Sequence, residues 1–230
     1  MDLGRALGYA FEDEEWLPKL AILVIVTLAS VLLLPVLVGF LGLALLAGYL
    51  VDLVRNVRDG HPRPLPRWDR YGDLIAKGGN VLVGAFVYAL PNALISCCLW
   101  FFGASAGDSL IGGGINTLLL CCSVPLLLLY NLAVGPMLAL GIARYAEEGN
   151  IGVFFQFGDL FGTMQRQSSI TLQYILYTFI VNILLGFVGV IPCIGWVAVP
   201  ALAIPVHGYL IGHYAELADD KPKRKPKRAY

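Results

Sequence analysis

The sequence is poor in charge and in the residue patterns of common enzymes. Only 14% of its 230 residues are Asp, Glu, Lys or Arg, and histidine occurs three times. It contains no His-Glu-x-x-His, phosphate-binding loop or Cys-x-x-Cys motif. The sequence therefore favours a non-enzymatic protein, and it predicts no catalytic residue, no cofactor and no metal site.

Apolar residues are abundant instead, at 58% of the chain with a mean hydropathy of +0.74. Three stretches are almost free of charge: residues 20–51, residues 78–142 with only Asp108, and residues 167–215 with only two histidines. A bilayer core of about 30 Å needs roughly 20 apolar residues per helical span. We therefore predict an all-α, polytopic integral membrane protein.

The three apolar stretches predict hairpins of membrane helices within one domain, residues 1–216. A cluster of Gly, Ser and Asp at residues 103–114 and a cluster of Gly and Pro at residues 189–195 mark two of the turns. Pro35 and Gly39 interrupt the first stretch, which favours two helices there and six in total. A single tilted span in this stretch, giving five helices, is the alternative. The predicted hairpins are 20–54, 78–143 and 168–216, and the segments outside them are 1–19, 55–77, 144–167 and a basic, disordered tail at 217–230.

The basic residues predict the orientation of these hairpins. All 16 Lys and Arg residues lie before residue 20 or within 55–77, 144–166 and 221–228. Basic segments are retained on the cytoplasmic side during insertion. We therefore expect these segments, including the C-terminus, on the inner side of a prokaryotic plasma membrane.

A short pattern occurs twice in the inner segments and indicates an internal repeat. It consists of Arg-x4-Gly, a polar stretch, and then aromatic-Gly-Asp-Leu. Its residues are Arg55, Gly60, Gly72 and Asp73 in the first copy, and Arg144, Gly149, Gly158 and Asp159 in the second. We expect the arginines to satisfy carbonyls at helix ends, the first glycines to turn the chain, and the aspartates to be partners of the arginines. Substituting either arginine would then cost the same stability.

Residues 68–77 and 152–164 mix aromatic with polar side chains, which is typical of short amphipathic helices lying in the membrane interface. A soluble cytoplasmic loop is the alternative for both segments. Residues 61–66 carry three prolines and predict a stiff, extended spacer before the first of them.

Several of these residues carry a resemblance to a known family. They are Phe11, Asp13, Trp16, Gly48, Tyr49, Leu50, Arg55, Gly60, Leu65, Pro66, Trp68, Gly72, Arg144, Tyr145, Ala146, Gly149 and residues 154–157. In them the chain resembles the prokaryotic membrane family catalogued as domain of unknown function 4013. The layout is also similar to the membrane domain of some glycerophosphodiester phosphodiesterases. The resemblance implies a membrane location and this architecture, and it implies no activity.

Few polar residues fall inside the apolar stretches. We interpret His207 as a hydrogen-bonded packing residue, and Asn92, Asn131, Gln173 and Asn182 as interhelical hydrogen-bonding residues. Two vicinal pairs, Cys97 with Cys98 and Cys121 with Cys122, flank the turn at residues 103–114. Small apolar residues at helix contacts are the preferred interpretation of these cysteines, with a disulfide or a soft-metal site left open.

The tail carries six cations in eight residues, and we expect it to contact anionic lipid headgroups. The cations are Lys221, Lys223, Arg224, Lys225, Lys227 and Arg228. Each such cation contributes about 1 kcal/mol near an anionic surface. A tail that only sets orientation and solubility is the alternative, and no nucleic-acid partner is expected.

Two classes of function remain. The first is a non-enzymatic membrane scaffold, assembly factor or bilayer modulator, with membrane proteins or further copies of the chain as partners. The alternative is a transporter or channel for a neutral or amphipathic solute, with helices broken near Pro125, Pro136, Pro200 and Pro205.

Overall fold

A computed structural model describes residues 3–105, 110–192 and 194–218, and these form helices with no strand among them. In chain order the elements are α1 (Leu3–Gly8), η1 (Tyr9–Glu12), α2 (Trp16–Leu32), η2 (Leu34–Val36), α3 (Gly39–Arg58), α4 (Tyr71–Ser105), α5 (Leu110–Glu148), η3 (Ile151–Phe155), α6 (Phe157–Arg166), α7 (Ser168–Gly189) and α8 (Ile194–Ala218). The all-α prediction is confirmed.

Five helices are long and apolar enough to cross a membrane: α3, α4, α5, α7 and α8. The segments Gly4–Glu12 and Trp16–Leu32 meet at 108°, and together they meet the same length and apolarity requirements as a sixth, bent segment. The chain is therefore a multi-pass integral membrane protein with five straight candidate spans and one bent candidate.

The first apolar stretch forms two helices, as Pro35 and Gly39 predict. α2 ends at Leu32, a short 3-10 turn contains Pro35, and α3 begins at Gly39. Leu37 has a φ of +62° in this turn. A Cβ on Gly39 would lie 2.2 Å from the carbonyl oxygen of Ser30. Glycine at this position therefore allows α3 to return close beside α2.

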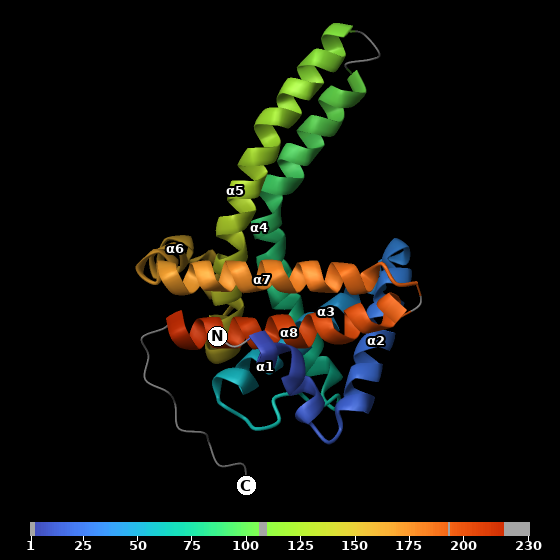
Figure 1. Ribbon diagram of the computed structural model, residues 1–230, viewed down its shortest axis with the longest axis vertical. Helices are drawn as coiled ribbons and strands as arrows, with labels where there is room; N and C mark the ends of the chain where they lie inside the picture. Colours follow the sequence, from blue (N-terminus) through green and yellow to red (C-terminus); the bar gives the residue numbers. More distant parts are fainter. Residues whose placement is uncertain (1–2, 106–109, 193, 219–230) are drawn as a thin grey trace.

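The longest helices, α4 and α5, form a pair that extends far beyond the other helices (Figure 1). They contain 35 and 39 residues, which correspond to about 52 and 58 Å. α7 and α8 lie side by side and cross the base of this pair at a steep angle (Figure 1). We call the free part of the pair, residues 90–105 and 110–135, the α4–α5 arm.

The helix breaks expected near four prolines are not present. Pro125 and Pro136 lie inside the continuous α5, and Pro200 and Pro205 lie inside the continuous α8. A proline costs one backbone hydrogen bond, but neighbouring groups within a membrane can compensate without a break in the helix.

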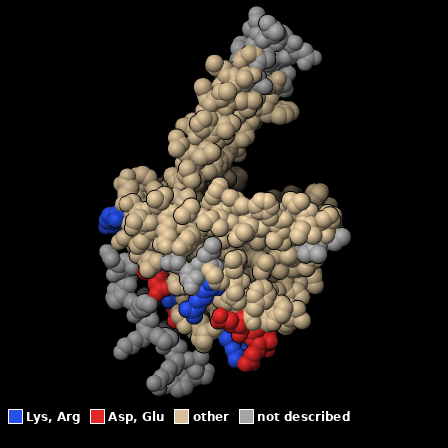
Figure 2. Space-filling model, in the orientation of Figure 1, with Lys and Arg blue, Asp and Glu red and all other residues tan. Residues whose placement is uncertain are grey.

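The core lies at the base of the arm, where α3 packs between α4 and α8. Glycines make these crossings close, because a Cβ on Gly78 would lie 1.6 Å from the carbonyl oxygen of Ala44, and one on Gly208 would lie 2.4 Å from Leu53. Tyr49 and Tyr214 are fully buried here. The Lys, Arg, Asp and Glu side chains visible in Figure 2 gather on this lower half, away from the arm.

The first inner segment differs from its predicted form. Residues 71–77 are not a separate interfacial helix, because they form the first two turns of the continuous α4. α4 therefore begins seven residues before the predicted start of the hairpin at residue 78. The ammonium of Lys77 lies 2.7 Å from Asp52 and 2.8 Å from Asp73, so its charge is neutralised inside the helix pair and requires no break.

The second inner segment lies partly inside the core. Phe154 in η3 is buried between α4 and α5, where a Cβ on Gly84 or Gly141 would lie 2.6 or 2.9 Å from its ring. α6 follows as a separate helix and exposes Phe157 and Phe161. The predicted interfacial position therefore fits α6, but not η3.

Candidate functional site

The two copies of the repeated motif end their helices with the same backbone geometry. Gly60 follows α3 and Gly149 follows α5, and each has a φ of +67°. The N–H of Gly149 donates to the carbonyl of Tyr145 at 2.8 Å, and the N–H of His61 donates to the carbonyl of Asn56 at 3.0 Å. Glycine adopts this left-handed conformation without steric cost. The structure thus places both glycines where the chain turns from a long helix into an inner segment.

The second half of the motif begins a helix in both copies. Asp73 and Asp159 are each the third residue of their helix, where a carboxylate stabilises the exposed N–H groups. The leucine that follows each aspartate, Leu74 or Leu160, is fully buried. Gly72 and Gly158 face open space.

The two arginines of the motif do not share an environment. Arg144 has a side chain that is 10% exposed, and it donates to Asp159 and to the hydroxyl of Thr163 at 2.9 Å. Arg55 is 57% exposed and lies 4.0 Å from Asp59. Asp73 pairs with Lys77 and Arg70 instead. The expected arginine–aspartate partnership is therefore present in the second copy, whereas Arg55 and Asp73 each have other partners.

Arg58 takes the role at helix ends that the sequence assigned to Arg55. Its guanidinium donates to the carbonyl of Ala143 at 3.3 Å and pairs with Glu147 at 2.9 Å, which joins the end of α3 to the end of α5. Glu147 is separated from Arg58 by the same 89 residues as Arg144 from Arg55. Opposite charges at equivalent positions of two repeated segments are the signal that could have identified this pair.

Lys19, near the start of α2, is the centre of a polar cluster formed with residues of the N-terminal segment and the 59–70 loop. The ammonium of Lys19 donates to Asp13 at 2.7 Å and to the carbonyl of Leu65 at 3.3 Å. The indole N–H of Trp68 donates to the carbonyl of Lys19 at 3.1 Å, and its ring stacks on Tyr49 at 4.4 Å. Asp13, Tyr49, Leu65 and Trp68 all belong to the residues that carry the family resemblance, but no sequence feature showed that they meet around Lys19.

Asp13 is the buried anion of this cluster, at 3% exposed. Burial alone would raise the pKa of its carboxyl group. The hydrogen bonds from Lys19 and from the backbone N–H of Glu15, with the charges of Lys19 and Arg63, outweigh burial and lower that pKa below its usual range. Asp13 is therefore a carboxylate throughout the physiological pH range.

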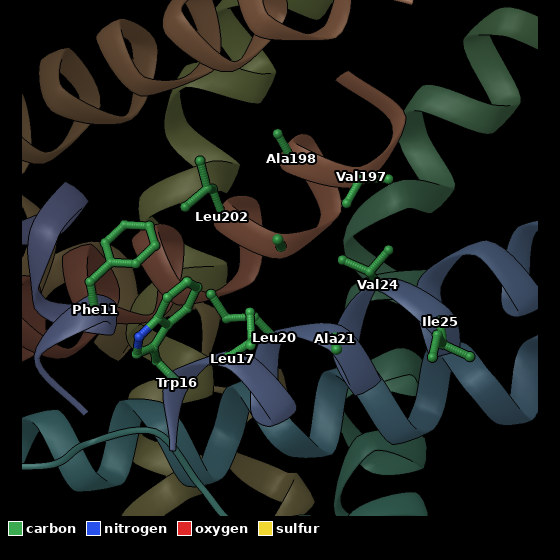
Figure 3. A pocket seen from close by; sticks show the side chains of 11 residues that line it. Phe11, Trp16, Leu17, Leu20, Ala21, Val24, Ile25, Val197, Ala198 and Leu202 are labelled. Atoms are coloured by element: carbon green, nitrogen blue, oxygen red, sulfur yellow. The ribbon is translucent and has the colours of Figure 1, made fainter. Parts of the chain in front are cut away.

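An apolar groove of about 440 Å³ lies between α2 and α8. Trp16, Leu20 and Val24 line it from α2, and Val197 and Leu202 line it from α8 (Figure 3). The rings of Phe11 and Trp16 meet edge to face, 5.1 Å apart, at one end of the groove. Its side chains can hold a hydrocarbon chain, but they offer no reactive group.

The polar residues of the apolar segments form hydrogen bonds within the protein. Asn92 of α4 and Asn131 of α5 exchange two amide hydrogen bonds of 3.0 and 3.2 Å, which confirms their interhelical role. Asn182 and Gln173 instead bond within α7. The ring of His207 lies 2.8 Å from the carbonyl of Ala203 in its own helix, in agreement with a packing role.

The cysteine pairs and the basic tail are the remaining predicted sites. Cys97, Cys98, Cys121 and Cys122 are unpaired and exposed, not packed at helix contacts. No group of three or more His, Cys, Asp or Glu side chains that could hold a metal ion occurs among the described residues. The six cations of the tail lie outside the described residues.

Comparison with known proteins gives one match. Residues 28–194 match a family described as "Protein of unknown function (DUF4013)". No curated protein and no solved structure matches the chain. The similarity in layout to glycerophosphodiester phosphodiesterases is therefore not shown by these comparisons.

Proposed function

The chain belongs to the DUF4013 family of proteins of unknown function, and we propose that it is a non-enzymatic membrane scaffold or assembly component that binds other membrane helices through the α4–α5 arm. The observation that carries this proposal is the arm itself, a pair of long helices that no other described part of the chain covers. A scaffold needs such a surface, because its partners must reach it within the bilayer.

The sides of the arm are apolar and large. Leu94, Trp100, Leu126 and Leu129 are between 58% and 75% exposed, and none of the most apolar part of the α5 span is buried inside the protein. Hydrocarbon alone can solvate such a surface, so exposure by itself does not define a partner site.

The amide pair of Asn92 and Asn131 distinguishes the arm from a purely lipid-facing surface. Each amide has two N–H donors. Those of Asn131 bond Asn92 and the carbonyl of Leu127, whereas one donor of Asn92 bonds Asn131 and the other has no acceptor among the described residues. An unsatisfied N–H in hydrocarbon is costly, and an interhelical hydrogen bond contributes about 0.6 to 2 kcal/mol. This donor therefore favours a partner helix with an acceptor at the same depth.

The distribution of Lys and Arg residues supports a membrane orientation for this scaffold. We place it in a prokaryotic plasma membrane, with the inner segments and the C-terminus cytoplasmic and residues 107 and 192 external. The basic tail then faces the anionic inner leaflet. Cysteine-accessibility labelling in intact cells tests this orientation, because external labelling near Gly149 would reverse it.

In-membrane photo-crosslinking tests the scaffold role. A photoreactive residue at Leu129 on the arm should form an adduct with a defined protein chain, identified by mass spectrometry, which includes a second copy of this protein. The matched control is Leu172 on α7, which is 68% exposed and should give only lipid adducts.

A substitution separates the amide contribution from simple apolar contact. Asn92→Leu should reduce the protein adduct several-fold, whereas Asn182→Leu should leave it unchanged, because Asn182 lies on α7, outside the arm. Lipid adducts alone at Leu129 would refute the scaffold role.

The alternative, solute transport, predicted helix breaks that the structure does not contain. Solute uptake into liposomes containing the purified protein would support transport instead of the scaffold role.

A further inference from the structure

A charged hollow of about 480 Å³ lies beside the N-terminal turns of α2, on the face opposite the α2–α8 groove. Its walls combine two cations, two carboxylates and an aromatic ring with the apolar side of α2. The residues used below are Glu15, Lys19, Ile22, Arg67, Trp68 and Asp69. We propose that this hollow binds the headgroup of a zwitterionic phospholipid that carries a phosphate and a primary ammonium, as phosphatidylethanolamine does.

The cations of the hollow have hydrogen-bonding capacity left for a phosphate. Lys19 has three N–H donors and uses two of them, for Asp13 and for the carbonyl of Leu65. Arg67 is exposed and has no ion-pair partner among the described residues. A guanidinium binds two phosphate oxygens at once, and the N-terminus of α2 adds a favourable dipole.

The carboxylates of the hollow are suited to an ammonium group. Glu15 is 66% exposed and lies 3.9 Å from Lys19, and Asp69 is 61% exposed and lies 3.9 Å from Arg70. Both distances are long for ion pairs, so each carboxylate can accept hydrogen bonds from a bound ammonium. A headgroup without an ammonium, such as the neutral glycerol of phosphatidylglycerol, would leave these two carboxylates without a cationic partner, which favours a zwitterion.

The hollow continues into a surface that suits acyl chains. Ile22 lines it, and Val26 and Ala29 follow on the same face of α2 at helical spacing, partly or fully exposed. Trp68 is held by its hydrogen bond to Lys19 and by stacking on Tyr49, so its ring forms a fixed wall at headgroup level. The hollow thus offers cations for a phosphate, carboxylates for an ammonium and an adjoining apolar surface for acyl chains.

Native mass spectrometry of the full chain, titrated with phosphatidylethanolamine, phosphatidylcholine and phosphatidylglycerol of equal chain length, tests the proposal. Phosphatidylethanolamine should bind most tightly. Arg67→Gln and Asp69→Asn should each weaken its binding by about tenfold, the loss expected for one charge-assisted hydrogen bond. Arg55→Gln and Asp59→Asn are the matched controls, because that exposed pair lies outside the hollow, and they should leave binding unchanged.

Four other outcomes bear on the assignment. Equal binding of the three lipids, or equal effects of Arg67→Gln and Arg55→Gln, would overturn it, and so would preference for phosphatidylglycerol that Arg67→Gln weakens. Soluble phosphoethanolamine at the same concentration should not displace the lipid, because it cannot contact the apolar face of α2. Displacement would assign the hollow to a free phosphate compound instead. Since the arm takes no part in this site, failure here leaves the scaffold role untouched.

Discussion

At the residue scale, Arg144 is the cation that holds the second inner segment to α5. Its guanidinium is buried against Asp159 and Thr163, whereas Arg55, the matching residue of the first copy, is more than half exposed. Loss of a buried charge partner costs far more than loss of an exposed one. The two arginines therefore have unequal effects on stability, in contrast to the equality that the repeated motif predicts.

Arg144→Ala should lower the free energy of unfolding by about 2 kcal/mol, because it removes a buried side chain and its hydrogen bonds to Asp159 and Thr163, while Asp159 stays exposed to solvent. Arg55→Ala should change it by less than about 0.5 kcal/mol. Denaturant unfolding of the purified protein in detergent measures both values. Arg144→Lys is the control for charge, and it should recover part of the loss because lysine can reach only one of the two partners at a time. Equal losses for the two alanine variants would contradict this account.

Asp13 makes the stability of the folded protein depend on pH. The pKa of its carboxyl group is lowered in the folded protein, so its stabilising effect is complete above the unfolded pKa of about 3.9 and is lost as the pH falls through the lower, folded value. Thermal unfolding of the wild type should therefore shift downward below about pH 4. Asp13→Asn should be less stable at pH 7, by about 3 kcal/mol, because Lys19 loses its charged partner. In that variant the acid-dependent shift should shrink, and a shift of unchanged size would assign the pH dependence to other carboxyl groups.

At the scale of elements, the crossing of α3 and α4 depends on single glycines. Gly78 faces Ala44, and Gly48 faces Leu74, where a Cβ would lie 1.9 Å from the carbonyl oxygen. Backbones this close leave no flexible side chain to move aside. α8 approaches α3 differently, because Gly208 and Gly212 face the side chains of Leu53 and Val57.

Adjacent glycines provide a matched test of this crossing. Gly78→Ala should destabilise the protein by several kcal/mol or prevent its folding, because its Cβ would lie 1.6 Å from the backbone oxygen of Ala44. Gly79→Ala should be neutral or stabilising by up to about 1 kcal/mol, since Gly79 faces open space and alanine is the better helix former. Size-exclusion chromatography and thermal unfolding of both variants measure the difference. Similar behaviour of the two would mean that α3 and α4 do not cross this closely.

At the scale of the whole molecule, charge is concentrated at one end and the arm at the other (Figures 1 and 2). The basic tail follows α8 in the sequence. Six cations at about 1 kcal/mol each would hold residues 221–228 against an anionic bilayer, while Pro222 and Pro226 disfavour a folded binding site. Contact should therefore depend on surface charge and not on headgroup identity.

Replacing the six tail cations with Gln should release a fluorescent label at Tyr230 from anionic liposomes, with the membrane helices still folded by circular dichroism. High salt should have the same effect on the wild type. A wild-type tail that stays bound at about 1 M salt, where the Debye length is near 3 Å, would require a specific binding site in place of diffuse attraction.

The sequence by itself determined the features that depend on local properties. Apolar length predicted the membrane helices, Pro35 with Gly39 predicted the break between α2 and α3, and Gly60 and Gly149 marked turns of the chain. Each follows from hydropathy or backbone sterics within a few residues. The tertiary structure alone decided which charges are buried and which residues meet, because those outcomes depend on helix packing. Arg58 with Glu147, Lys19 with Trp68, and the continuity of α4 through Lys77 all depend on contacts between residues at least 25 positions apart, where local pattern carries no information on distance.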